Sequence, residues 1–234
     1  MHLLLVGNCS LIFSQGRDLP DHFWSLSDEH PQSCIVNGSM QRKILSLTFD
    51  DGPSEVTALV LDLLNKYRTK ATFFWQGKNL IERPDLVRRA MAEGHELANH
   101  SWDHPNGESM DVHKLWKEQI ETTNLLYDSL FQVKIDLYRP PFGAITSDQV
   151  AYLADQGMLT VLWSLSTLDW DTERNTGTEI IDRFRDQLHP GAIVLLHDVD
   201  FDNTSSEMLK ALEEIIVYRK AEGYEFVTVS DIMK

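Results

Sequence analysis

The apolar residues of this chain fall into short runs, and the stretches between the runs repeat their apolar residues with the period of a helix. The runs predict strands at Ile44–Phe49, Ala71–Trp75, His95–Ala98, Ile135–Tyr138, Leu159–Trp163, Ala192–Leu196 and Phe226–Val229. The periodic stretches predict helices at Glu55–Tyr67, Asp85–Glu93, Met110–Phe131, Ser147–Gln156, Thr178–Leu188 and Ser205–Glu222. Strand and helix therefore alternate along the chain.

Glycines mark several of the expected helix ends. Gly94, Gly157 and Gly223 each follow a helical stretch and precede a strand, the position at which a left-handed residue commonly ends a helix. Alternating strands and helices imply a parallel sheet with crossover helices. About seven such units favour a closed or nearly closed α/β barrel over an open sheet.

Residues 17–41 are polar and rich in turn formers, with no sustained period. We therefore divide the chain into a lead-in, residues 1–42, and one folded domain, residues 43–234. The apolar stretch within residues 1–16 is too short and too interrupted to span a bilayer. It fits a secretory signal cleaved near Gly16, although no Lys or Arg precedes the apolar region, and it fits an ordered first strand or a ragged terminus equally well.

The charge and the cysteine content of the chain argue against several classes of binding partner and of structural site. The formal net charge of −15 argues against nucleic acid or an anionic membrane surface as the main partner, because polyanions would be repelled. The two cysteines, Cys9 and Cys34, are too few for a disulfide framework or a thiolate metal cluster, although a single bridge between them stays open.

Reactive polar side chains follow five of the expected strands. They are Asp50 and Asp51, His100 and His104, Arg139, Asp169, and His197 with Asp198. The carboxyl ends of the strands in a parallel barrel open on one face, and such barrels carry their sites there. The sequence therefore predicts a single site that collects these side chains.

The histidines His100 and His104 are four residues apart, so one turn of helix would set both imidazoles on the same side. Pro105 would then close the turn. The spacing suits a divalent metal, but it also fits a solvated helix turn or two histidines at the edge of a core. A catalytic zinc site commonly has three protein ligands and one position for water, so the pair needs a third ligand.

The acids Asp50 and Asp51 leave the first strand of the domain side by side. One carboxylate can supply the third ligand while the other takes a proton from the activated water. Neighbouring residues at a strand end point in different directions, so adjacent acids can fill both roles. The letters "DDGP" also suit a plain turn, which would be the better interpretation without the histidines.

Two further features complete the candidate chemistry. Arg139 precedes two prolines, and this rigid segment could hold a carboxylate base in place. Asp169 and His197 leave neighbouring strands of the predicted barrel, and a carboxylate that keeps a histidine protonated makes a general acid. Each of these residues, taken alone, is more often structural.

Five segments in order, "TFDDGPS", "HSWDH", "RPPFG", "STLDW" and "IVLLHD", resemble the motifs of the polysaccharide deacetylase family, the NodB-homology domain of carbohydrate esterase family 4. The match runs from about Lys43 to Val229. The resemblance implies a distorted (β/α) barrel that uses a metal to remove N-acetyl groups from N-acetylglucosamine polymers such as chitin or peptidoglycan. It implies a secreted or cell-envelope monomer, without a transmembrane segment, whose partner is the acetylated glycan.

The resemblance also implies a role for each candidate residue. The metal is usually zinc, with Co²⁺ or another divalent cation as the alternative, and its ligands would be Asp51, His100 and His104. Asp50 would be the general base, held by Arg139.

The general acid would be His197, oriented by Asp169. The backbone N–H of Phe142 would help to stabilise the oxyanion, and Phe142 and Trp170 would line the sugar groove.

The chain departs from the family pattern at two positions. Ser166 stands where many members have the first acid of D-x-x-D-W, and Phe142 stands where tyrosine is frequent, although a role of the Phe142 backbone survives that change. Relatives of this family also remove acetyl esters from xylan or hydrolyse small cyclic amides, and a barrel of this fold could bind glycans without catalysis. The motifs do not separate these alternatives.

Overall fold

The computed structural model of the protein describes residues 22–202 and 205–234, so the expected signal segment 1–16 and Cys9 lie outside the described residues. Its strands form one sheet in the order β1-β6-β5-β4-β3-β2-β8-β7, with β9 paired to β2. Neighbouring strands are parallel throughout. The strands are β1 (Cys34–Ile35), β2 (Ile44–Asp50), β3 (Thr72–Trp75), β4 (Glu96–Asn99), β5 (Leu137–Tyr138), β6 (Leu159–Val161), β7 (Leu165–Ser166), β8 (Ala192–His197) and β9 (Glu225–Phe226).

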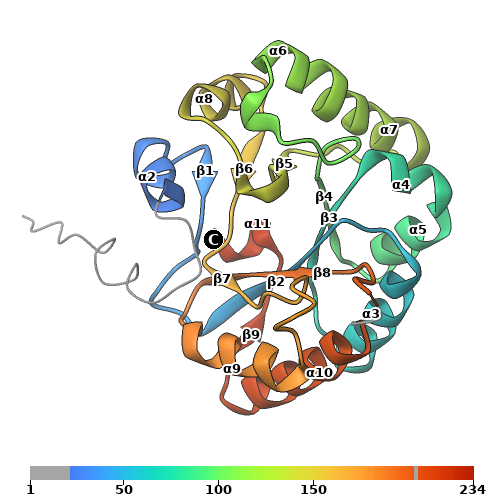
Figure 1. The fold of residues 1–234 in the computed structure, drawn as a ribbon, viewed down its shortest axis with the longest axis vertical. Coiled ribbons are helices and arrows are strands. Elements are labelled where there is room, and N and C mark those ends of the chain that lie inside the picture. The colour runs from blue at the N-terminus through green and yellow to red at the C-terminus, as the bar shows by residue number, and fades with distance from the viewer. Residues whose placement is uncertain (1–21, 203–204) are drawn as a thin grey trace, which may run out of the picture.

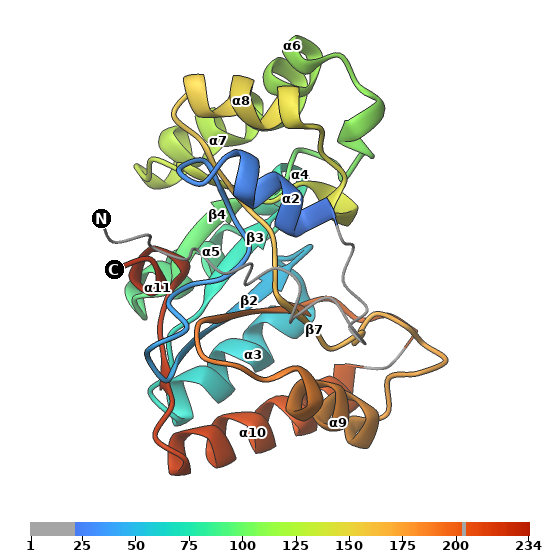
Figure 2. The same cartoon turned by 90° about the vertical axis from the view of Figure 1, so that its left-hand side faces the viewer.

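Most of the helices surround this sheet on the outside, whereas α11 lies near the middle of the view in Figure 1. The helices are α2 (His22–Glu29), α3 (Glu55–Lys66), α4 (Gly77–Glu82), α5 (Pro84–Ala92), α6 (Val112–Lys114), α7 (Thr122–Phe131), α8 (Ser147–Asp155), α9 (Gly177–Gln187), α10 (Ser205–Ala221) and α11 (Val229–Ile232). A π-helical segment, Leu115–Glu121, joins α6 to α7. The helices that follow β2 to β8 lie on the outer sides, whereas α2 lies across the remaining side, in front in Figure 2.

This arrangement of parallel strands and outer helices confirms the predicted α/β barrel. The barrel is distorted, because no pairing joins β1 to β7 in the part of the chain that the structure describes. None of the helices of residues 22–202 and 205–234 is long and apolar enough to cross a membrane.

Strands β2 and β8 lie together at the centre of the core. All seven residues of β2 are buried, and β8 pairs with it from Leu45 to Asp50. Strands that are covered on both faces have mostly apolar sequences. For this reason the predicted ends of β2 and β8 differ from the observed ends by no more than one residue. The register sets Asp50 directly opposite His197, so two of the candidate residues end neighbouring strands at the same level.

Side-chain caps explain where several helices begin. Ser54 accepts a hydrogen bond from the N–H of Val56 and forms a capping box with Thr57 at the start of α3. Thr146 and Gln149 form the same box at α8. Such caps satisfy N–H groups that have no partner inside the helix.

The predicted strand Phe226–Val229 is wrong beyond its first residue. β9 ends at Phe226, and α11 begins at Val229, because the Thr228 side chain accepts a hydrogen bond from the N–H of Asp231 and caps a helix there. The short elements α4 and β7 were not predicted either, since a two-residue strand or a six-residue helix leaves too little periodicity to detect.

The lead-in contains regular structure that its sequence does not suggest. α2 and β1 both lie within residues 17–41, and β1 extends the sheet by pairing with β6. Phe23 of α2 is fully buried and packs edge-on against Trp163, with ring centroids 4.8 Å apart. The described part of the lead-in therefore belongs to the barrel.

Candidate active site

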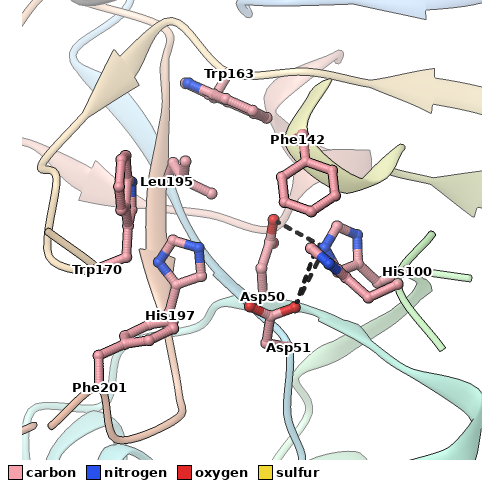
Figure 3. A pocket seen from close by; sticks show the side chains of 10 residues that line it. Asp50, Asp51, His100, Phe142, Trp163, Trp170, Leu195, His197 and Phe201 are labelled. Carbon is pink, nitrogen blue, oxygen red and sulfur yellow. Dashed lines mark ion pairs between the residues drawn. The ribbon is translucent and has the colours of Figure 1, made fainter. Parts of the chain in front are cut away.

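The carboxyl ends of the strands open into a pocket of about 380 Å³ (Figure 3). It is lined by Asp50, Asp51, His100, His104, Phe142, Trp163, Trp170, Leu195, His197 and Phe201. β2 ends in Asp50 and β8 ends in His197, while His100 directly follows β4. The structure thus brings the side chains at these strand ends to one face of the barrel.

Three of the lining residues, Asp51, His100 and His104, hold their ligand atoms close enough together to share one metal ion. Asp51 Oδ1 lies 3.3 Å from His104 Nε2 and 3.6 Å from His100 Nε2. Bonds to zinc are about 2.0–2.2 Å long, so neighbouring donors in a tetrahedral site are roughly 3.4 Å apart. The donor types and their spacing therefore fit a divalent cation such as zinc.

The tautomer of His100 supports this arrangement. Its Nδ1 lies 2.8 Å from the carbonyl oxygen of Arg139, which can only accept, so Nδ1 donates and Nε2 keeps its lone pair for the pocket. Burial, and then the neighbouring His100, lower the pKa of His104. A lowered pKa favours the neutral imidazole that binds metals.

The two histidines do not lie on a helix, so that prediction is wrong. Residues 100–106 form an irregular bend, in which Ser101 and His104 have φ angles of 68° and 67°. Side chains replace the helical hydrogen bonds: Asn99 Oδ1 accepts from the N–H of Ser101, and Ser101 Oγ accepts from the N–H of His104. The two imidazoles still lie next to each other, edge to face, with ring centroids 5.0 Å apart.

Asp50 and Arg139 form a buried ion pair. Arg139 Nη1 donates to Asp50 Oδ1 over 2.7 Å, and the guanidinium is fully buried over the ring of Phe74. Thr48 Oγ1 and the carbonyl oxygen of Val161 accept further hydrogen bonds from it. Because these partners fix the guanidinium, it can hold the Asp50 carboxylate in one orientation.

Asp169 and His197 form a second pair. Asp169 Oδ1 lies 2.9 Å from His197 Nδ1, and Asp169 Oδ2 accepts from the backbone N–H of His197 over 2.8 Å. Burial alone would lower the pKa of His197, but the charge and hydrogen bond of Asp169, with the charges of Asp51 and Asp50, raise it to about 9. The imidazole therefore carries a proton at neutral pH.

Aromatic side chains form the mouth of the pocket. Phe142 is 65% exposed and Trp170 is 45% exposed, whereas Tyr218 is the only other exposed Phe, Trp or Tyr among the residues that the structure describes. Trp163, Leu195 and Phe201 also line the pocket, and sequence reasoning missed them. Trp163 and Leu195 lie near the ends of apolar runs that predict strands. The sequence alone therefore predicts that both side chains belong to the hydrophobic core.

Ser166, the departure from the family's fourth motif, lies buried in β7 and is not among the described residues that line the pocket. Gln187 bonds to its backbone at both the N–H and the C=O group. The Asp169–His197 contact forms with Ser166 in place.

Asp198 was predicted to join the same site, with no role of its own, but it is not among the described residues that line the pocket. Its buried carboxylate accepts hydrogen bonds from the Gly52 N–H, Thr57 Oγ1 and Trp75 Nε1 at 2.5–3.0 Å. Burial raises the pKa of Asp198 to about 7, against these hydrogen bonds, which lower it. A Cβ on Gly52 would lie 2.3 Å from the carboxylate, so glycine is required for Asp198 to hold the turn that carries Asp50 and Asp51.

Comparison with known proteins identifies a matching family and similar proteins. A family model described as polysaccharide deacetylase matches residues 37–161. The peptidoglycan-N-acetylglucosamine deacetylase PgdA of Listeria monocytogenes is 37% identical over 191 residues, which are 81% of this chain and 39% of that protein. The peptidoglycan-N-acetylmuramic acid deacetylase PdaA of Bacillus subtilis is 33% identical over 199 residues, which are 84% of this chain and 73% of that protein.

A solved structure gives the same result for the fold. The Bc1960 peptidoglycan N-acetylglucosamine deacetylase, in complex with 4-naphthalen-1-yl-N-oxidanyl-benzamide, matches with a TM-score of 0.79 at 31% identity. The match covers 85% of this chain and 91% of that chain. The predicted distorted (β/α) barrel is thereby confirmed.

Proposed function

From the premise that this chain belongs to the polysaccharide deacetylase family, we propose that it is a cation-dependent hydrolase that removes N-acetyl groups from an N-acetylglucosamine-containing glycan and releases acetate. One observation carries the proposal: three residues that could share a cation line the same pocket as Asp50 and His197, and each of these two is held by an ion pair. The triad is Asp51, His100 and His104, and the pairs are Asp50–Arg139 and Asp169–His197.

Peptidoglycan is the substrate that we propose first, with chitin or its oligosaccharides as the alternative. The Listeria and Bacillus relatives are named for the deacetylation of peptidoglycan, and this chain aligns with most of the Bacillus protein. Peptidoglycan lies in the cell envelope, so the proposal includes a secreted or envelope location. The exposed rings of Phe142 and Trp170 suit the apolar faces of sugar rings.

The base of the reaction would be Asp50. Arg139 occupies its Oδ1, and its Oδ2 lies on the side of His100, 3.7 Å from Nε2. When a divalent cation is bound by the triad, it would supply Lewis acid chemistry, because it lowers the pKa of water and polarises the acetamide carbonyl. Asp50 Oδ2 would take the proton of the water that attacks the carbonyl carbon.

The acid would be His197. Asp169 holds its Nδ1 and leaves Nε2 for the pocket, so the imidazolium can give its proton to the amine nitrogen as the carbon–nitrogen bond breaks. The backbone N–H of Phe142 would stabilise the oxyanion. The products are acetate and a glycan that carries a free amine.

Asp169→Asn is expected to move the alkaline limb of the pH–rate profile to lower pH. The charge of Asp169 raises the pKa of His197, so its removal lets the imidazolium lose its proton at a lower pH, and the acid form is then scarce at mildly alkaline pH. The rate there should fall by roughly 10²-fold. The measurement is kcat/KM for acetate release as a function of pH.

Asp171→Asn is the matched control for this change. Asp171 lies in the same loop but pairs with Arg174 over 2.6 Å, so its profile should equal that of the unaltered protein. An Asp169→Asn protein with an unchanged alkaline limb would show that Asp169 does not set the protonation of His197.

Acetate release on a panel of acetylated glycans tests the proposed function itself. Release from peptidoglycan is expected to exceed release from chitooligosaccharides, and release from acetylated xylan should be lowest. Preference for xylan would favour the esterase alternative, and turnover of a small cyclic amide alone would favour the amidase alternative. Tight glycan binding without acetate release, with Zn²⁺ or Co²⁺ present, would favour the non-catalytic barrel.

A further inference from the structure

Gln76 lies at the same rim as the candidate ligands. It directly follows β3, which is the neighbour of both β2 and β4, and it is only 6% exposed. Its Nε2 donates to Asp51 Oδ1 over 2.7 Å. The orientation of the amide is determined by this contact, because a carboxylate oxygen can only accept.

The oxygen that Gln76 contacts is also the one that faces the histidines. Asp51 Oδ1 lies within 3.6 Å of Nε2 of both His100 and His104. A carboxylate oxygen has two lone pairs, so the amide occupies one of them and the other remains for a cation between the imidazoles. The hydrogen bond therefore restricts rotation of the Asp51 carboxylate, as outer contacts of metal ligands commonly do.

The backbone of Asp51 is held from the same direction. Its φ of 76° is rare for a residue other than glycine. The N–H of Asp51 donates to the carbonyl oxygen of Phe74, and Asn79 Nδ2 donates to the carbonyl oxygen of Asp51. With the backbone fixed in this way, the direction of the carboxylate depends on its side-chain contacts, of which Gln76 gives the shortest.

The oxygen of the Gln76 amide is expected to lower the stability of the fold. Gln76 Oε1 is buried, and no described residue donates a hydrogen bond to it. An unsatisfied buried acceptor is destabilising, whereas an apolar side chain of similar size would avoid that loss. A residue that lowers the stability of the fold is expected where function requires it.

We propose that Gln76 is a positioning residue that holds the Asp51 carboxylate in the orientation that binds the cation. This inference rests on the cation-dependent function proposed above. Gln76 touches neither the substrate nor the reacting water in this account. It acts through Asp51, so its loss should weaken cation binding more than it weakens the fold.

Gln76→Met and Gln76→Leu test the inference, because both remove the amide donor and keep a side chain of similar size. The dissociation constant for Zn²⁺, measured by competition with a chromophoric chelator, is expected to rise about 10- to 100-fold. The Tm of the metal-free protein should shift by about 4 °C or less. Two variants are used so that poor packing of one does not decide the result.

Gln187→Met is the matched control, because Gln187 is also 6% exposed and bonds to the N–H and C=O groups of Ser166. It should lower the Tm and leave the Zn²⁺ dissociation constant unchanged. If both Gln76 variants bind Zn²⁺ as tightly as the unaltered protein, the inference is overturned and the proposed function stands. If the unaltered protein binds no Zn²⁺, both are overturned.

Discussion

Asp50→Asn is expected to lower the rate of acetate release by about 10²- to 10⁴-fold, which is the usual contribution of a general base. Asparagine can still accept the hydrogen bond from Arg139 Nη1, but it cannot take a proton from water. Cation binding should stay near that of the unaltered protein, because the proposed ligand is the neighbouring Asp51. Acetate release and metal content are measured on the same sample.

The substitution also removes the counter-ion of a buried guanidinium. Breaking a buried pair in this way typically costs about 3 kcal/mol of stability or more, so the rate must be measured well below the Tm of the variant. Asp62→Asn is the control, since Asp62 pairs with Arg89 at the surface over 2.6 Å. An Asp50→Asn protein that keeps its cation and works at the original rate would exclude Asp50 as the base.

The long, buried elements of the fold could be predicted from the sequence. β8 is an apolar run up to His197, and β2 is a largely apolar run with buried Ser46 and Thr48, because outer helices and the barrel interior cover both faces. The helices α3, α8 and α9 carry a clear apolar stripe and begin at capping boxes. Pattern and final structure agree where local propensity and burial act in the same direction.

The short elements could not be predicted in the same way. β1 has two residues, and it exists because β6 offers a free edge that is distant in sequence. α2 lies within the polar stretch 17–41, and its place depends on the packing of Phe23 against Trp163. Such contacts join residues that are distant in the sequence, so no local sequence pattern predicts them.

The candidate site, too, could be predicted from the sequence only in part. Its residue types and their order along the chain indicated which side chains meet, because parallel strands end at one face. The His100–His104 spacing suggested a helix, and this failed because Asn99 and Ser101 supply side-chain acceptors that shape a bend instead. Gln76 follows β3 as His100 follows β4, so the strand-end criterion could have found it.

Removal of the cation is expected to be the second large effect. Protein stripped with a chelator should release acetate about 10²-fold more slowly or worse, because a Lewis acid stabilises transition-state charge by several kcal/mol. His104→Ala should resemble the stripped protein and should not recover with added Zn²⁺. His113→Ala is the control, because His113 is exposed and contacts Tyr152, and neither residue lines the pocket.

The most direct test of one cation shared by Asp51, His100 and His104 is a titration of the stripped protein with Zn²⁺ while acetate release is followed. We expect the rate to rise in proportion to the added Zn²⁺ and to stop rising at one equivalent per chain. Full activity before any cation is added, or a plateau that needs two equivalents, would contradict the account.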